Sequence, residues 1–174
     1  MKKTIYILFL SLIVASCGSL DELLELKVEN SLTETIAATV PQTSNVPVAV
    51  DLSDTVHLNS GDLAQYKDKI KSIKINSLSY KFKDFIGNTA GVIPTGTLKF
   101  DDVILGELTD FNISDAAVAG TSFGITDEVK LNQIASNFVN NSKLTVKLSG
   151  SVLSEAGEMT FNIEVFINMT VTLK

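Results

Sequence analysis

Few residues in this chain of 174 residues have the chemistry of a catalyst. His57 is the only histidine, and Asp51 and Asp54 precede it closely. A Ser-His-Asp triad would have to use this histidine as its general base. We interpret His57 instead as an exposed loop histidine. We predict that the protein is not an enzyme and has neither catalytic residues nor a cofactor.

Acidic residues are the candidate metal ligands, because one Cys and one His cannot form a Cys/His zinc site. Asp101 and Asp102 are adjacent, and Asp51, Asp54 and Asp62 form a looser trio whose carboxylates would suit Ca²⁺. Their spacing matches no EF-hand loop, and neighbouring residues of a strand point to opposite faces of a sheet. We therefore interpret them as solvated acids and predict no metal site.

The basic residues argue against nucleic acid as a partner. The formal net charge is −6, and all 14 basic residues are lysines, so no arginine is present to read bases. Six lysines nevertheless cluster between positions 67 and 83. This cluster either faces lipid headgroups or an acidic polymer, or is the solvated face of a helix and a strand. Its members are Lys67, Lys69, Lys71, Lys74, Lys81 and Lys83.

The N-terminal residues have the pattern of a secretory signal that ends at a cysteine. Lys2 and Lys3 precede an apolar run over residues 5–15, which is too short to cross a bilayer as a helix. Directly after it comes Cys17, the only cysteine of the chain, which follows the small residues of Val14-Ala15-Ser16. The mature chain therefore has no internal disulfide, and its stability must come from a buried core.

This ending resembles the lipobox of bacterial lipoproteins, although the family favours Leu where Val14 stands. The resemblance implies cleavage between Ser16 and Cys17 and lipidation of Cys17 by palmitate or similar acyl chains. Gly18, where an Asp would favour the inner membrane, implies an outer-membrane anchor in a Gram-negative cell envelope. The membrane is then the first expected partner, and several acyl chains make such an anchor effectively permanent.

The first half of the mature chain alternates between apolar and polar residues. Even-numbered apolar positions over residues 26–40 predict a strand that ends at Pro41, although a spacing of four also fits a helix. Residues 46–52 alternate in the same way, and Pro47 favours an edge strand. Residues 60–70 have the spacing of a short helix. Beyond it, the apolar positions change from odd to even at Asn76 and Ser77, which predicts a β-bulge.

The middle of the chain contains a predicted loop and a predicted helix. Residues 87–96 hold three Gly and one Pro and indicate a loop, after which alternation resumes over residues 98–104. Residues 110–124 allow no firm assignment. Thr126 has the character of an N-cap, and apolar residues then recur at helical spacing until Asn140 and Asn141.

The C-terminal third has the clearest strand pattern. Residues 144–152 alternate, and beyond a turn every second residue is apolar over eight positions. At about 3.3 Å per residue this last strand would span about 50 Å, so we expect a bend or a change of sheet near Phe166. The eight positions are Met159, Phe161, Ile163, Val165, Ile167, Met169, Val171 and Leu173.

Strands with one apolar face each must bury that face, and packing one sheet on another is the simplest solution. We predict a mainly β chain: an immunoglobulin-like β-sandwich with one or two short helices over residues 26–174. It follows a signal peptide of residues 1–16 and a lipidated linker of residues 17–25. Thr55, in Asp54-Thr55-Val56, is similar to a short O-glycosylation signal of some Gram-negative envelopes.

These patterns favour a non-catalytic interaction or structural module, anchored by lipid in the cell envelope, with an envelope protein of unidentified kind as partner. The alternative is a carrier or sensor that holds an apolar ligand between its sheets, since Leu, Ile, Val and Phe are abundant.

Overall fold

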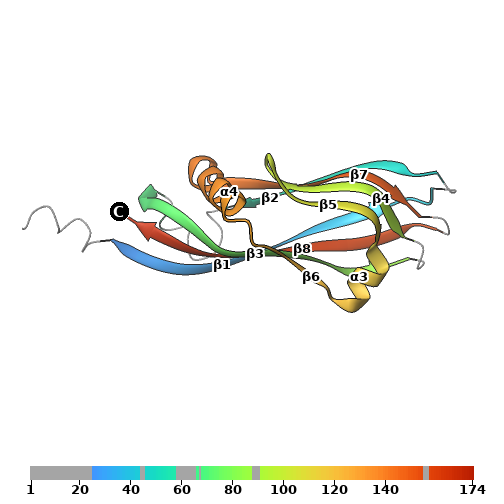
Figure 1. The fold of residues 1–174 in the computed structure, drawn as a ribbon, viewed down its shortest axis with the longest axis horizontal. Helices are drawn as coiled ribbons and strands as arrows, with labels where there is room; N and C mark the ends of the chain where they lie inside the picture. The colour runs from blue at the N-terminus through green and yellow to red at the C-terminus, as the bar shows by residue number, and fades with distance from the viewer. Residues whose placement is uncertain (1–24, 44–45, 58–65, 67, 88–90, 155–156) are drawn as a thin grey trace, which may run out of the picture.

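The computed structural model describes residues 25–43, 46–57, 66, 68–87, 91–154 and 157–174 (Figure 1). Two helices and eight strands form in these residues. The helices are α3 (Ile113–Ala119) and α4 (Glu128–Asn141). The strands are β1 (Leu26–Val40), β2 (Val48–His57), β3 (Ile70–Ile86), β4 (Val92–Phe100), β5 (Val103–Asn112), β6 (Ser122–Ile125), β7 (Lys143–Leu153) and β8 (Met159–Leu173).

The strands form two four-stranded sheets. Sheet A has the order β1-β8-β3-β6, and sheet B has the order β2-β7-β4-β5. All neighbouring strands are antiparallel. The first half of the chain pairs with the second half as in one long hairpin that is rolled up on itself, with the pairs β1–β8, β2–β7, β3–β6 and β4–β5. The predicted mainly β sandwich with two short helices is confirmed. Its strand order is that of an eight-stranded jelly roll, which refines the immunoglobulin-like expectation.

The core lies between the facing sheets, and β8 contributes most regularly to it. None of its eight alternating apolar side chains is more than 3% exposed. The change of sheet predicted as one possibility near Phe166 is wrong, because β8 stays in sheet A throughout. Residues 26–40 of β1 pair with β8 without interruption along its whole length, and β3 pairs along its other side. Phe166 lies on the outer face, where the ammonium group of Lys81 lies 4.9 Å from its ring centroid.

Two local predictions about strands are confirmed. The register of β3 against β8 shifts between Ile75 and Ser77, where the apolar phase changes in the sequence. The bulge keeps Ile75 and Leu78 on the same buried side although they are three residues apart. The strand of the Pro47 segment is β2, which is an edge of sheet B.

The predicted loop over residues 87–96 is too long, because β4 begins at Val92. Its glycines serve close packing: a Cβ on Gly91 would lie 2.8 Å from the Met159 sulfur, and one on Gly96 would lie 2.8 Å from a methyl carbon of Ile93. Glycine inside a strand often marks such a close approach rather than a turn.

The uninterrupted alternation predicted over residues 98–104 is also wrong. Asp101 and Asp102 form the turn between β4 and β5, so the side chains that follow are Val103 and Leu105 on the inside and Ile104 on the outside. Asp101 adopts a φ of 46°, a left-handed conformation that Asp tolerates better than most residues.

The helices differ in how well the sequence predicts them. The helix after Thr126 is confirmed as α4, but Asp127 is its N-cap. Helix α3 and strand β6 occupy the stretch that the sequence left unassigned. The helix expected over residues 60–70 lies mostly outside the described residues, and Ile70 begins β3 instead. Within the described part of the chain, neither helix has the length and apolar character needed to cross a bilayer.

Candidate functional site

Part of the β3 edge that faces away from β8 pairs with no strand among the described residues. On one side β3 pairs with β8 from Ile70 to Ile86. On its other side β6 pairs with it only from Leu78 to Lys81. Along the first part of β3, residues 70–77, no described strand pairs with this second side. Alternate residues of an edge strand direct their N–H and C=O groups away from the sheet, so the backbone groups of this segment have no strand partner in the part of the chain that the structure describes.

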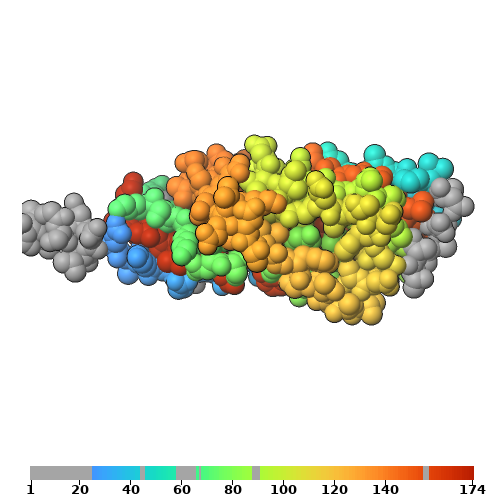
Figure 2. Space-filling view, viewed as in Figure 1, coloured from blue at the N-terminus to red at the C-terminus, as the bar shows by residue number. Residues whose placement is uncertain are grey.

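Helix α4 lies beside this edge of β3 and forms the opposite wall of a groove. In the space-filling view α4 (orange) lies against β3 (green), next to the end of the molecule from which β1 begins (Figure 2). Two hollows follow one another along β3. The larger, of about 670 Å³, is lined by residues 74–79 of β3, by residues 124–126 and by the first turns of α4. The smaller, of about 260 Å³, is lined by residues 71–73 and by the later turns of α4.

The sequence of α4 explains why it holds this position. The carboxylate of Asp127 accepts hydrogen bonds from the backbone N–H groups of Val129, at 2.9 Å, and Lys130, at 3.2 Å, which starts the helix. The buried face of α4 packs on the sandwich, and the adjacent face of the helix lines the groove beside β3. The buried residues are Leu131, Ile134, Ala135 and Phe138.

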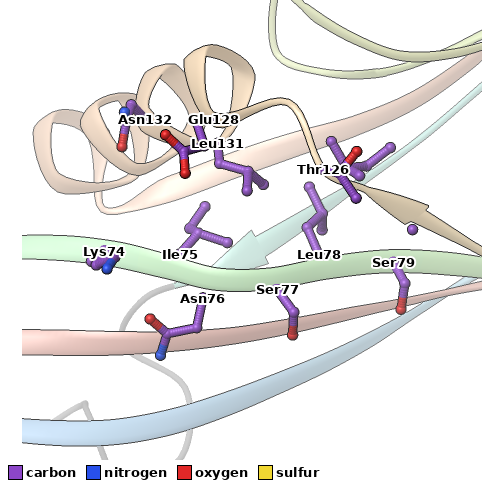
Figure 3. Close-up of a pocket in the computed structure, with 12 residues that line it drawn as sticks. Lys74, Ile75, Asn76, Ser77, Leu78, Ser79, Thr126, Glu128, Leu131 and Asn132 are labelled. Atoms are coloured by element: carbon purple, nitrogen blue, oxygen red, sulfur yellow. The ribbon is translucent and has the colours of Figure 1, made fainter.

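The groove has an apolar side and a polar side. In Figure 3 the side chains of Ile75 and Leu78 on β3 point toward Leu131 on α4. Asn76 and Ser77 point to the other side of β3, toward the outer face of sheet A. Asn132 is exposed on α4 and lines both hollows, so the two adjoin along β3, and we refer to them together as the groove.

Ion pairs hold the outer face of sheet A beside this groove. Glu164 on β8 is bound by Lys81, at 2.9 Å, and by Lys83. The hydrogen bond from Lys83 is the main cause that holds the pKa of Glu164 below its ordinary value, and that from Lys81 adds to it, while burial opposes both. The same bond to Glu164 raises the pKa of Lys83.

The lysines nearer the groove differ in whether they form an ion pair. Lys71 binds Glu25 just before β1, and this hydrogen bond lowers the pKa of Glu25. Lys74 lines the larger hollow, is exposed and forms no ion pair with any acid that the structure describes. Among the lysines of this cluster, Lys81 and Lys83 are therefore neutralised by Glu164, Lys71 is paired with Glu25, and Lys74 lines the larger hollow. Lys69 is exposed, and Lys67 lies outside the described residues.

The histidine and aspartates considered for catalysis do not form a site. His57 is the last residue of β2, exposed, and opposite Lys143. The predicted loop position is therefore wrong, because His57 lies in a strand. Asp51, six residues earlier in the same strand, pairs with Lys147 at 2.9 Å. Asp54 accepts a hydrogen bond from the backbone N–H of Thr55 at 2.7 Å.

The acids considered as calcium ligands are also dispersed. Asp101 Oδ1 accepts from the backbone N–H of Thr145, and Asp102 is exposed in the same turn. Asp62 lies outside the described residues. Among the residues that the structure places, no three His, Cys, Asp or Glu side chains lie close enough to hold a metal ion.

A serine signature at the junction of α3 and β6 was missed in the sequence, and the structure places it clearly. Residues 120–124 read Gly-Thr-Ser-Phe-Gly and fit the Gly-x-Ser-x-Gly pattern of hydrolases. A nucleophile turn connects a strand to a following helix, whereas here helix α3 precedes strand β6. Ser122 is the exposed first residue of β6 opposite Lys81, and His57 lies in the other sheet. The pattern is therefore coincidental.

The predicted modification sites are placed only in part. Ser16 and Cys17, and the boundaries at residues 16 and 17, lie outside the described residues, so cleavage and lipidation stay predictions. Thr55 is half-buried in β2, opposite Thr145. Its O-glycosylation also stays a prediction.

Neither a protein-family model nor a curated protein matches this chain. Among solved structures, it is similar to the decameric BFDV capsid protein, with a TM-score of 0.45 and 9% identity over 84% of this chain and 99% of that chain. A mud crab tombus-like virus structure has a TM-score of 0.40 and 10% identity, over 86% of this chain and 80% of that chain. At TM-scores below 0.5, these similarities carry no information about what this chain binds.

Proposed function

We propose that this chain is a non-catalytic interaction module, anchored by lipid at Cys17 to the outer membrane of a bacterial cell envelope. The observation that carries the anchor is the position of the only cysteine, directly after Val14-Ala15-Ser16 at the end of a short apolar signal. A thiol in a small-residue segment is what a lipid-transferring enzyme requires. The acidic charge of the remaining chain and its lack of arginine favour an envelope protein over nucleic acid as partner.

The arrangement of the described residues supports a binding role over catalysis. The aspartates and the histidine lie apart, while β3 and α4 border an open groove. The alternative role, a carrier or sensor of an apolar ligand, requires a cavity between the sheets. Both hollows described above lie beside β3 instead, and inward side chains such as Leu148 and Ile163 are fully buried. We therefore favour the interaction module.

Metabolic labelling with an alkyne fatty acid tests the anchor. We expect the wild-type protein expressed in a Gram-negative host to carry the label and to fractionate with the outer membrane. Cys17→Ala should lose the label, and Ser19→Ala, as the matched control, should keep it. An unlabelled wild type, or a labelled Cys17→Ala variant, would contradict the proposed anchor.

Affinity capture of the full lipoprotein from envelope extracts tests the interaction role. We expect reproducible co-purification with one protein complex, compared with a control capture from cells that carry only the empty tag. Recovery of a stoichiometric bound lipid without any protein would instead establish the carrier function and overturn our proposal.

A further inference from the structure

We propose that the groove between β3 and α4 binds an extended peptide of a partner protein, in which apolar and acidic residues alternate. The peptide adds to sheet A as a fifth strand beside residues 70–77 of β3. This inference rests on the proposed interaction role and names the chemistry of the partner. The other occupants, a second copy of the chain and its own linker, are outcomes of the test below.

The backbone of β3 determines the extended form of the partner. Residues 70–77 are held in strand geometry by β8 on one side, and their other side faces the groove. A peptide that lies there satisfies these backbone groups as in other cases of strand addition. Strand β6 already does so for residues 78–81, and the chain then turns at Thr126 toward α4, so no strand of the described residues continues the line of β6 along residues 70–77.

The side chains of the groove determine the alternation. An added strand directs every second side chain to the inner side, beside the apolar residues Ile75 on β3 and Leu131 and Val139 on α4. The side chains between them point to the outer face, on the same side as Lys74. Apolar residues therefore suit the first set of positions and acidic residues the second, because opposite charges on neighbouring strands attract.

Charge distinguishes this edge from the other edges of the sandwich. The edge strand β2 bears Asp51 and Asp54, and the edge strand β5 bears Glu107 and Asp110. Residues 70–77, in contrast, contain no acid, in a chain of net charge −6. Of their two lysines, Lys71 pairs with Glu25, and Lys74 forms no ion pair with a described acid, while Glu128 lines the larger hollow from α4. Residues 70–77 also lack a proline and an inward-pointing charge, two of the devices with which natural edge strands avoid pairing, while the bulge between Ile75 and Ser77 lies at the end of this segment. An acidic strand is thus the complementary partner.

The test measures binding of a fluorescent eight-residue peptide of alternating Val and Glu to the full lipidated protein in zwitterionic detergent micelles. A Val-Lys peptide of the same length is the matched probe. We expect the Val-Glu peptide to bind at least about tenfold more tightly than the Val-Lys peptide. Hydrogen–deuterium exchange should slow in residues 70–77 when the Val-Glu peptide is added, and equal affinity of both peptides would overturn the proposal.

Charge variants locate the site. Lys74→Glu should weaken the Val-Glu peptide about tenfold and strengthen the Val-Lys peptide, a reversal that an unfolded variant would not show. Lys27→Glu, an exposed position on β1 at the opposite edge of sheet A, should change neither affinity. On α4, Asn132→Glu should weaken the Val-Glu peptide, and its exposed neighbour Gln133→Glu should not. Equal effects within either pair would overturn the proposed location.

Backbone-modified peptides test strand addition directly. Two Val-Glu peptides are made with N-methyl groups on alternate residues, one on the valines and one on the glutamates. A strand hydrogen-bonds to its neighbour through alternate residues, so we expect one of the two peptides to lose binding and the other to retain it. Retention by both would show that the peptide lies in the groove without pairing to β3, and would overturn the proposal.

The remaining outcomes identify a different occupant. Self-association of the wild type in sedimentation, abolished by Lys74→Glu, would assign the groove to a second copy. A large gain in peptide affinity on changing Asp21 and Glu22 to Lys would assign it to the chain's own linker. Both results would overturn the proposal. Peptide binding does not depend on fatty-acid labelling of Cys17, so the failure of one is distinguishable from the failure of the other.

Discussion

Asp101 and Thr145 join the β4–β5 turn to β7 through two hydrogen bonds. The backbone N–H of Thr145 donates to Asp101 Oδ1 at 2.9 Å, and the backbone N–H of Asp101 donates to the Thr145 carbonyl at 2.8 Å. The second carboxylate oxygen of Asp101 is buried and has no hydrogen-bond partner among the described residues. One side chain therefore sets where β4 ends, and it does so from a left-handed backbone conformation.

Replacement of Asp101 separates these two roles. Asp101→Ala removes the hydrogen bond and leaves a Cβ in the left-handed conformation, so we expect a loss of about 2–3 kcal/mol in the free energy of unfolding. Asp101→Gly also removes the hydrogen bond, but glycine tolerates the left-handed conformation. The loss in the free energy of unfolding should therefore be smaller than for Asp101→Ala. Denaturant unfolding measures both, and equal losses would show that the backbone conformation contributes nothing.

Gly150→Ala tests the close approach of β7 to β4. A Cβ at this position would lie 2.2 Å from the Thr95 carbonyl oxygen and 2.6 Å from the Gly96 Cα, which are backbone atoms of a paired strand. We expect a loss of about 3 kcal/mol, because overpacking here must move the backbone. Gly124→Ala is the control, since nothing lies within 4 Å of its added Cβ. Thermal unfolding of the two variants should differ clearly.

The ion pairs of Glu164 predict a pH dependence of stability. The pKa of Glu164 is lower in the folded protein than its ordinary value of 4.5, so the ionised form stabilises the fold. This contribution is present above pH 4.5 and is lost as the pH falls through the lower folded pKa. The wild type should exceed Glu164→Gln in melting temperature at pH 7, and the difference should shrink toward pH 3. Glu107→Gln is an exposed control, and a constant difference for Glu164→Gln would contradict the prediction.

The N-cap of α4 should affect both the stability of the helix and peptide binding in the groove. Asp127→Ala removes both cap hydrogen bonds and should cost about 1 kcal/mol, with faster hydrogen exchange in the first turn of the helix. Because Glu128 and Leu131 in that turn line the larger hollow, the same variant should weaken the Val-Glu peptide. Thr126→Ala is the control for stability, since Thr126 does not cap the helix. Equal stability of the two variants would contradict the assigned cap.

Local periodicity was sufficient to predict several elements. The strand with eight alternating apolar residues, the bulge at Asn76 and Ser77 and the helix before Asn140 were all predicted from spacing alone, because each buries one face at its own period. The start of β4 and the turn at Asp101 were not predicted. In both places, a glycine or an aspartate was selected for a contact with a distant strand, which no local pattern reveals.

The sequence by itself determined a mainly β sandwich, an acidic chain without arginine and a single cysteine at the end of a signal-like segment, since composition and periodicity are properties of the chain. The tertiary structure decided the jelly-roll strand order and the groove. Both depend on which strand lies next to which: β6 pairs with only four residues of β3 before the chain turns into α4. Such pairings between remote segments are selected by packing of the whole core, so they leave no local trace in the sequence.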